Sequence, residues 1–96
     1  MWMLETVSGA DEPLTFRLLP GAIKTLGRAP RVDFIVDAPL VSRIHCRFTL
    51  KEGVLEIEDL DSTNGTYVNG ERVDKRTLDP GDTLKIGRVE FVARPA

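Results

Sequence analysis

Short apolar segments alternate with turn residues along the whole chain, and no segment shows the periodicity of a long helix. Within the segments, apolar and polar residues tend to alternate, as in β-strands that have one buried and one solvent-facing side. Proline and glycine mark the turns between them, for example at Pro20-Gly21 and Pro80-Gly81. The pattern predicts about ten or eleven short strands, of which the first four cover residues 2–7, 14–19, 22–26 and 34–36.

The sequence predicts the register of two hairpins. Glu52-Gly53 fits a two-residue turn, because apolar residues then face apolar residues and opposite charges also pair. The pairs are Leu50 with Leu55, Phe48 with Ile57, Thr49 with Glu56, and Arg47 with Glu58. Gly87-Arg88 fits a second turn, which pairs Ile86 with Val89, Leu84 with Phe91, and Lys85 with Glu90. A slip by one residue would destroy these matches, so each register is well defined.

Residues 59–78 lie between the two hairpins and lack strong strand signals. They contain Asn64-Gly65 and Asn69-Gly70, and both residue types tolerate a left-handed backbone, so each pair predicts a chain reversal. Asn69-Gly70 is interpreted as a turn and no more. Asn64-Gly65 is flanked by hydroxyl groups beyond what a turn requires, on Ser62, Thr63 and Thr66.

Length and charge narrow the class of protein. The 96 residues suffice for one domain, predicted over residues 1–96, and the short, evenly spaced strands favour an all-β sandwich or barrel. A net charge of −2 argues against a nucleic-acid or anionic-membrane surface. Nine of the thirteen basic residues are arginine, the side chain best suited to bidentate phosphate recognition, so the net charge does not exclude a local cationic site.

Cysteine and hydropathy patterns bear on location and on metal binding. Cys46 is the only cysteine, so no intrachain disulfide is possible, and we expect its side chain in the core with Phe48 and Leu50. The chain has no apolar run typical of a signal peptide or a membrane span, which predicts a cytoplasmic or nuclear location. One histidine and one cysteine do not make a metal site, and no cofactor is expected.

Three polar clusters interrupt the apolar pattern at strand ends or loops: Gly27-Arg28, Ser42-Arg43-Ile44-His45 and Ser62-Thr63-Asn64-Gly65-Thr66. A strand framework gathers such loops at one rim, where binding residues collect. An arginine fork and a serine hydroxyl suit the oxygens of a phosphate dianion. Asn64 carries both a donor and an acceptor, which suits a peptide main chain. The clusters therefore predict a site for a phosphorylated, extended peptide.

Together with Asn69-Gly70, these clusters resemble, in order and spacing, the signature of the forkhead-associated (FHA) domain. The resemblance implies a two-sheet antiparallel β-sandwich of about eleven strands that binds phosphothreonine peptides through loops at one end. It implies a partner phosphorylated by a Ser/Thr kinase. It assigns phosphate binding to Arg28, Ser42, Arg43 and Thr63, peptide-backbone binding to Asn64, and loop structuring to Gly27, His45, Gly65, Thr66 and Asn69, with His45 bracing the loops.

Two other functions can be weighed on the sequence. A hydrolase would use Ser42 as nucleophile and His45 as base, but Ser42 lacks a glycine elbow, and in a strand residues i and i+3 point to opposite faces. No catalytic residue is therefore expected. The alternative that stays open is an FHA-fold scaffold that binds proteins without phosphorylation. The complete set of Arg28, Ser42, Arg43 and Asn64 favours phosphate dependence.

Overall fold

The computed structural model describes residues 1–96, and it is built of strands, turns and loops. No helix in it could cross a lipid bilayer. The eleven strands are β1 (Trp2–Ser8), β2 (Thr15–Leu18), β3 (Ile23–Gly27), β4 (Phe34–Ile35), β5 (Cys46–Lys51), β6 (Val54–Asp59), β7 (Thr66–Val68), β8 (Glu71–Val73), β9 (Lys75–Leu78), β10 (Thr83–Ile86) and β11 (Val89–Pro95).

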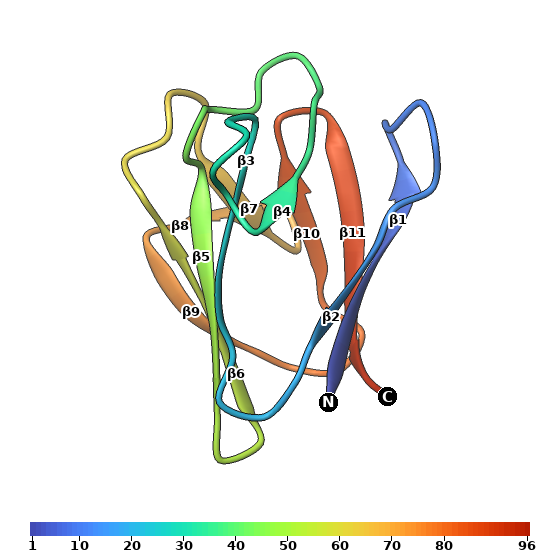
Figure 1. Ribbon diagram of the computed structural model, residues 1–96, viewed down its shortest axis with the longest axis vertical. Coiled ribbons are helices and arrows are strands. Elements are labelled where there is room, and N and C mark those ends of the chain that lie inside the picture. The colour runs from blue at the N-terminus through green and yellow to red at the C-terminus, as the bar shows by residue number, and fades with distance from the viewer.

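The strands form two sheets that pack against each other (Figure 1). One sheet has six strands in the order β2-β1-β11-β10-β7-β8, and the other has five in the order β4-β3-β5-β6-β9. The expected two-sheet β-sandwich is confirmed. One pair differs from the antiparallel prediction, because β4 runs parallel to β3. Residues 28–33 form a loop that returns the chain to a position beside β3 before β4 begins. β4 then runs in the same direction as β3.

Both predicted hairpin registers are confirmed. Leu50 faces Leu55 and Phe48 faces Ile57 between β5 and β6, and Leu84 faces Phe91 between β10 and β11. Glu52 and Gly53 have φ values of 53° and 77°, as the primed two-residue turn requires. Hairpin register was predictable because the side-chain alternation and the turn residues agree.

The segment 59–78 contains more strand than its sequence indicated. β7, β8 and β9 lie there, each of three or four residues. Segments this short do not show a recognisable alternation. They form strands because longer or better-defined neighbours pair with them, β10 with β7 and β6 with β9.

A core of twenty buried residues fills the space between the sheets. Phe16 of β2 stacks on Phe34 of β4, with ring centroids 4.5 Å apart, and so joins edge strands of opposite sheets. Cys46, Phe48 and Leu50 all belong to this core, as expected. Burial raises the pKa of the Cys46 thiol, which therefore stays protonated and unreactive.

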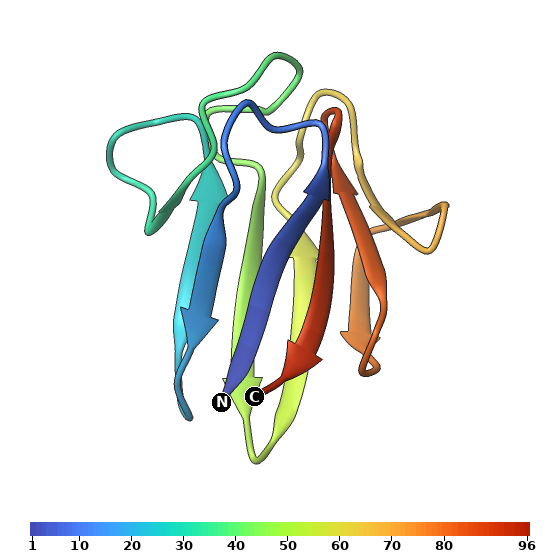
Figure 2. The same cartoon turned by 90° about the vertical axis from the view of Figure 1, so that its right-hand side faces the viewer.

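The connections divide between two ends of the sandwich. Figures 1 and 2 show loops gathered at the upper end and both termini at the lower end. We call the upper end the rim; its connections are residues 9–14, 28–33, 36–45, 60–65 and 87–88. Every one of the three polar clusters reaches the rim.

Candidate functional site

The rim holds a shallow depression of about 290 Å³. Its walls come from three connections: the β3–β4 loop, the β4–β5 loop and the β6–β7 loop. The lining residues are Arg28, Leu40, Val41, Ser42, Arg43, Thr63 and Asn64. The structure thus brings the five residues expected to contact a phosphopeptide to one place, although they are spread over 37 positions of sequence, from 28 to 64.

Gly27 allows the first two of these loops to meet. A Cβ atom at this position would lie 2.2 Å from the carbonyl oxygen of Arg43, so only glycine fits. Beyond it, the Arg28 N–H donates to the Ser42 carbonyl and the Ala29 N–H to the Arg43 carbonyl, both at 3.0 Å. These contacts hold Arg28 beside Ser42.

The Arg28 side chain is exposed, and one hydrogen bond within the chain orients it. Its Nε–H donates to the Val41 carbonyl at 2.8 Å. Both terminal nitrogens of the guanidinium lack a partner. The two terminal nitrogens of a residue that lines the depression are thus left as donors, and a guanidinium can use two such donors for bidentate contact with phosphate oxygens.

Ser42 places its hydroxyl between two loops. The Oγ atom accepts the Thr63 N–H at 2.9 Å, which joins the β4–β5 loop to the β6–β7 loop. That bond uses an acceptor lone pair and leaves the hydroxyl proton free to donate. Thr63 and Arg43 have exposed side chains that make no hydrogen bond within the chain.

Asn64 is also held by the neighbouring loop. One of its Nδ2–H groups donates to the Leu40 carbonyl at 3.1 Å. The second Nδ2–H and the Oδ1 atom have no partner within the chain. A donor and an acceptor on one amide can pair with the C=O and N–H of a peptide backbone, whatever its side chains.

His45 lies beneath the depression and is fully buried. Its Nδ1 accepts the Ser42 N–H at 3.0 Å, so Nε2 carries the proton and donates to the Gly65 carbonyl at 2.9 Å. Burial lowers the pKa of the imidazole, and the Gly65 bond and the Asp59 charge offset this only in part. A neutral His45 therefore ties the two loops together.

The strand geometry used against a Ser42–His45 catalytic pair is wrong. Residues 42–45 form a loop, and the two residues lie within hydrogen-bonding distance. The contact runs from the Ser42 main chain, however, and both imidazole nitrogens are occupied by backbone groups. His45 thus has no free nitrogen to take a proton from the Ser42 hydroxyl.

Asp59 organises the β6–β7 loop, and sequence reasoning missed it. Its carboxylate accepts the Ser62 N–H, the Ser62 hydroxyl at 2.6 Å and the Thr66 hydroxyl at 2.7 Å. Burial would raise the pKa of Asp59, but these bonds outweigh it and lower the pKa. The hydroxyls of Ser62 and Thr66 are thus used by the loop itself. The Asp-x-x-Ser spacing, typical of a side-chain-capped turn, was the available signal.

Asn69 does not lie at the rim. It follows the far end of β7, where its Nδ2–H donates to the Asp82 carboxylate and its Oδ1 accepts the Thr83 N–H, both at 2.9 Å. These bonds attach the β7–β8 turn to the start of β10. Gly65, in contrast, is buried at the rim, and its carbonyl accepts the His45 Nε2–H.

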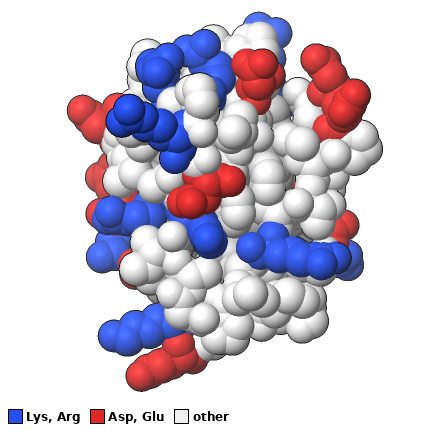
Figure 3. All heavy atoms as spheres, in the orientation of Figure 1, with Lys and Arg blue, Asp and Glu red and all other residues white.

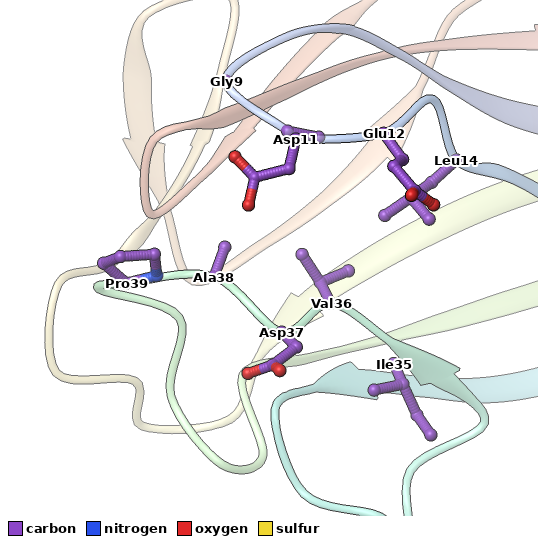
Figure 4. Close-up of a pocket in the computed structure, with 10 residues that line it drawn as sticks. Gly9, Asp11, Glu12, Leu14, Ile35, Val36, Asp37, Ala38 and Pro39 are labelled. Carbon is purple, nitrogen blue, oxygen red and sulfur yellow. The ribbon is translucent and has the colours of Figure 1, made fainter.

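A second hollow, of about 420 Å³, lies on the other side of the β4–β5 loop. In Figure 4, Asp11 and Glu12 line one wall and Asp37 the opposite one, over an apolar floor. Their charge would repel a phosphate. On the face in Figure 3, basic side chains gather at the upper left and acidic ones at the upper centre and right. The smaller depression, with Arg28 and Arg43, is therefore the better anion site.

Comparisons with known proteins agree with this geometry. A sequence profile described as the FHA domain matches residues 24–87. The chain is similar to the oxoglutarate dehydrogenase inhibitor of Corynebacterium efficiens, with 43% identity over 82% of this chain and 57% of that protein. This chain therefore spans little more than half of that relative's length.

Solved structures show the same likeness. The FhaA FHA domain, solved in complex with the intracellular domain of Rv3910, has a TM-score of 0.86 at 31% identity, over 98% of this chain and 100% of that chain. A second similar structure comes from an analysis of phosphothreonine-dependent FHA domain interactions. It has a TM-score of 0.85 at 28% identity, over 99% of this chain and 96% of that chain.

Proposed function

Because this chain belongs to the forkhead-associated (FHA) domain family, we propose that its rim binds phosphothreonine in an extended segment of a partner protein. The observation that carries the proposal is the set of unpaired donors around one depression: the Arg28 terminal nitrogens, the Ser42 hydroxyl and the Asn64 amide. A structure similar to this one comes from work on phosphothreonine-dependent interactions, which supports the choice of ligand.

Each residue has a role in this proposal. Arg28 and Ser42 bind the phosphate oxygens through charge-assisted hydrogen bonds, each worth roughly 1.5–3 kcal/mol. Arg43 and Thr63 stand beside the phosphate and add further donors. Asn64 pairs with the peptide main chain and keeps it extended. Gly27, His45, Gly65 and Thr66 shape the rim loops. Asn69, which was expected to do the same, holds the β7–β8 turn against the start of β10 instead.

The same contacts set the strength and selectivity of binding. A short peptide loses conformational freedom when it binds, so we expect a Kd on the order of micromolar. Threonine should be preferred to serine where its extra methyl group is buried, at roughly 1 kcal/mol per carbon. A peptide with glutamate in place of phosphothreonine should not bind, because a planar carboxylate with one charge cannot meet the same donors as a phosphate dianion.

The domain acts by binding and not by catalysis. Its one imidazole is buried and neutral, with both nitrogens bonded to backbone, and its one thiol is protonated in the core. The similar protein of Corynebacterium efficiens is named as an inhibitor of oxoglutarate dehydrogenase, which fits a binding role. We further propose that a Ser/Thr kinase phosphorylates the partner and that the interaction takes place in the cytoplasm or nucleus.

Calorimetry with matched peptides tests the proposal. A degenerate phosphothreonine library first identifies a ligand, which is then compared with its threonine and glutamate versions. Only the phosphorylated peptide should bind. Equal binding of the unphosphorylated peptide would reject phosphate recognition and favour the phosphorylation-independent scaffold.

The Arg28→Ala variant tests the phosphate contact directly. Loss of two charge-assisted bonds should weaken binding by roughly 100-fold or more. Stability should change little, because the side chain is exposed. Arg31→Ala is the matched control: Arg31 is an exposed arginine of the same loop that does not line the depression. Similar affinities for the two variants would reject Arg28 as the phosphate ligand.

A further inference from the structure

Leu40 has a backbone conformation that leucine rarely adopts. Its φ is +71°, in the left-handed region that favours glycine and asparagine. The Val41 N–H donates to the Ala38 carbonyl, which closes a four-residue turn over residues 38–41. Pro39 followed by a residue with positive φ is the pattern of a type II turn, where glycine is the usual choice at the second central position. The chain therefore maintains a strained leucine at the edge of its candidate site.

The strained segment holds the two side chains that the proposed function uses most. The Leu40 carbonyl accepts the Asn64 amide, and the next carbonyl, of Val41, accepts the Arg28 Nε–H. The Val41 side chain is 2% exposed and belongs to the core, so it fixes one end of the segment. Two consecutive carbonyls thus point at side chains from two different loops.

The β10–β11 turn packs against the backbone of the strained segment. A Cβ atom at Gly87 would lie 3.0 Å from the Pro39 carbonyl oxygen and 3.1 Å from the Leu40 carbonyl carbon. The turn therefore packs directly against the backbone of residues 39–40. Surroundings this close can hold a residue in a sparsely populated conformation.

We propose that Leu40 is a positioning residue of the rim site. Its left-handed backbone directs the Leu40 and Val41 carbonyls toward Asn64 and Arg28, and so orders both side chains before a ligand arrives. The inference rests on the proposed function for its effect on affinity. Its effect on Arg28 and Asn64 in the free protein does not depend on any ligand.

Two substitutions separate the backbone of Leu40 from its side chain. Leu40→Ile keeps the atoms but adds β-branching, which disfavours positive φ. Leu40→Asn removes the apolar side chain but suits positive φ. A role of the backbone predicts that Leu40→Ile weakens phosphopeptide binding at least about tenfold more than Leu40→Asn does. Thermal unfolding of both variants checks that each is folded.

NMR of the ligand-free proteins supplies the second measurement. The Arg28 Nε–H and the Asn64 side-chain amide should exchange slowly with water in the unmodified protein and in Leu40→Asn, and rapidly in Leu40→Ile. Equal exchange in all three proteins would overturn the inference, and so would equal affinity losses in the two variants. If no phosphopeptide binds the unmodified protein, the proposed function fails, and the exchange data alone decide the role of Leu40.

Discussion

At the scale of single residues, the site depends on groups that are partly used by the protein itself. Arg28, Ser42 and Asn64 each make one hydrogen bond to a neighbouring loop and keep other donors unpaired. The internal bond fixes the direction of the side chain, and the unpaired groups are left for a ligand. Less side-chain freedom is then lost on binding, which favours affinity.

The single histidine makes stability depend on pH. The pKa of His45 in the folded protein is lowered from its ordinary value of 6.5. As the pH falls through 6.5, the unfolded chain takes up a proton that the folded protein does not, so the free energy of unfolding decreases. The slope can reach about 1.4 kcal/mol per pH unit. Above about pH 7.5 both states are neutral at this residue, and it adds no pH dependence.

Urea denaturation between about pH 7.5 and pH 5.5 measures this effect. Since the chain has one histidine, no other imidazole contributes. The His45 ring signals should also keep their neutral chemical shifts at a pH where a free histidine is largely protonated. A flat free energy of unfolding over this range would contradict the buried, neutral imidazole.

The residue types of the candidate site were predictable from sequence. The hydrogen-bond partners that orient their side chains were not. Arg28, Ser42 and Asn64 stand in a recognisable order in the chain. The groups that hold Arg28 and Asn64, however, are the carbonyls of Val41 and Leu40. Every residue has a carbonyl, so its identity says nothing about where that carbonyl points. Asp59 was missed for a related reason, because an acidic residue at a strand end is usually solvated.

At the scale of elements, predictability followed strand length and turn chemistry. β5, β6 and β11 have six or seven residues, and the predicted register of both hairpins holds. β7 and β8 have three residues each and depend on their neighbours. The rim loops, in turn, depend on close approaches of backbone, such as the one at Gly27.

Replacing Gly27 by alanine should disrupt the contact between the end of β3 and the β4–β5 loop, and with it the candidate site. The new Cβ would lie 2.2 Å from the Arg43 carbonyl oxygen, so the β3 end and the β4–β5 loop must separate. We expect a loss of about 2 kcal/mol or more in stability, as for other overpacked sites, together with weaker phosphopeptide binding. Urea denaturation and calorimetry measure the two effects.

Gly21→Ala is the control for this substitution. Gly21 has a φ of +84° and no atom near its missing Cβ, so alanine there costs only backbone strain, about 1 kcal/mol. It also lies at the end of the sandwich opposite the rim, and phosphopeptide affinity should not change. If Gly27→Ala lost no more stability and affinity than Gly21→Ala, the close approach of Gly27 to the Arg43 carbonyl would not be essential.

At the scale of the whole molecule, the sandwich separates the rim, where the candidate site lies, from the end that carries the termini. The net charge is −2, so the protein as a whole does not attract an anion. Attraction arises within the depression, where Arg28 and Arg43 stand away from the acidic hollow. Recognition of phosphate should therefore be a short-range effect.

Salt dependence tests this conclusion. Raising NaCl from about 0.1 M to about 1 M should weaken phosphopeptide binding by less than about tenfold, because contact pairs are screened less than distant charges. Proteins that bind through extended basic surfaces lose far more over a smaller range of salt. Calorimetry at constant pH makes the measurement, and a loss of a thousandfold would indicate an extended electrostatic surface instead.

The sequence by itself determined the β-strand class, the register of both hairpins and the residue types available for phosphate. These follow from side-chain alternation, turn residues and the order of three polar clusters, all of which are local. Only the tertiary structure decided which hydrogen-bonding groups of those residues are left unpaired. It also decided that β4 runs parallel to β3 and that Asn69 lies away from the rim. Those outcomes depend on the direction of backbone carbonyls and on contacts between loops distant in sequence, which no local pattern records.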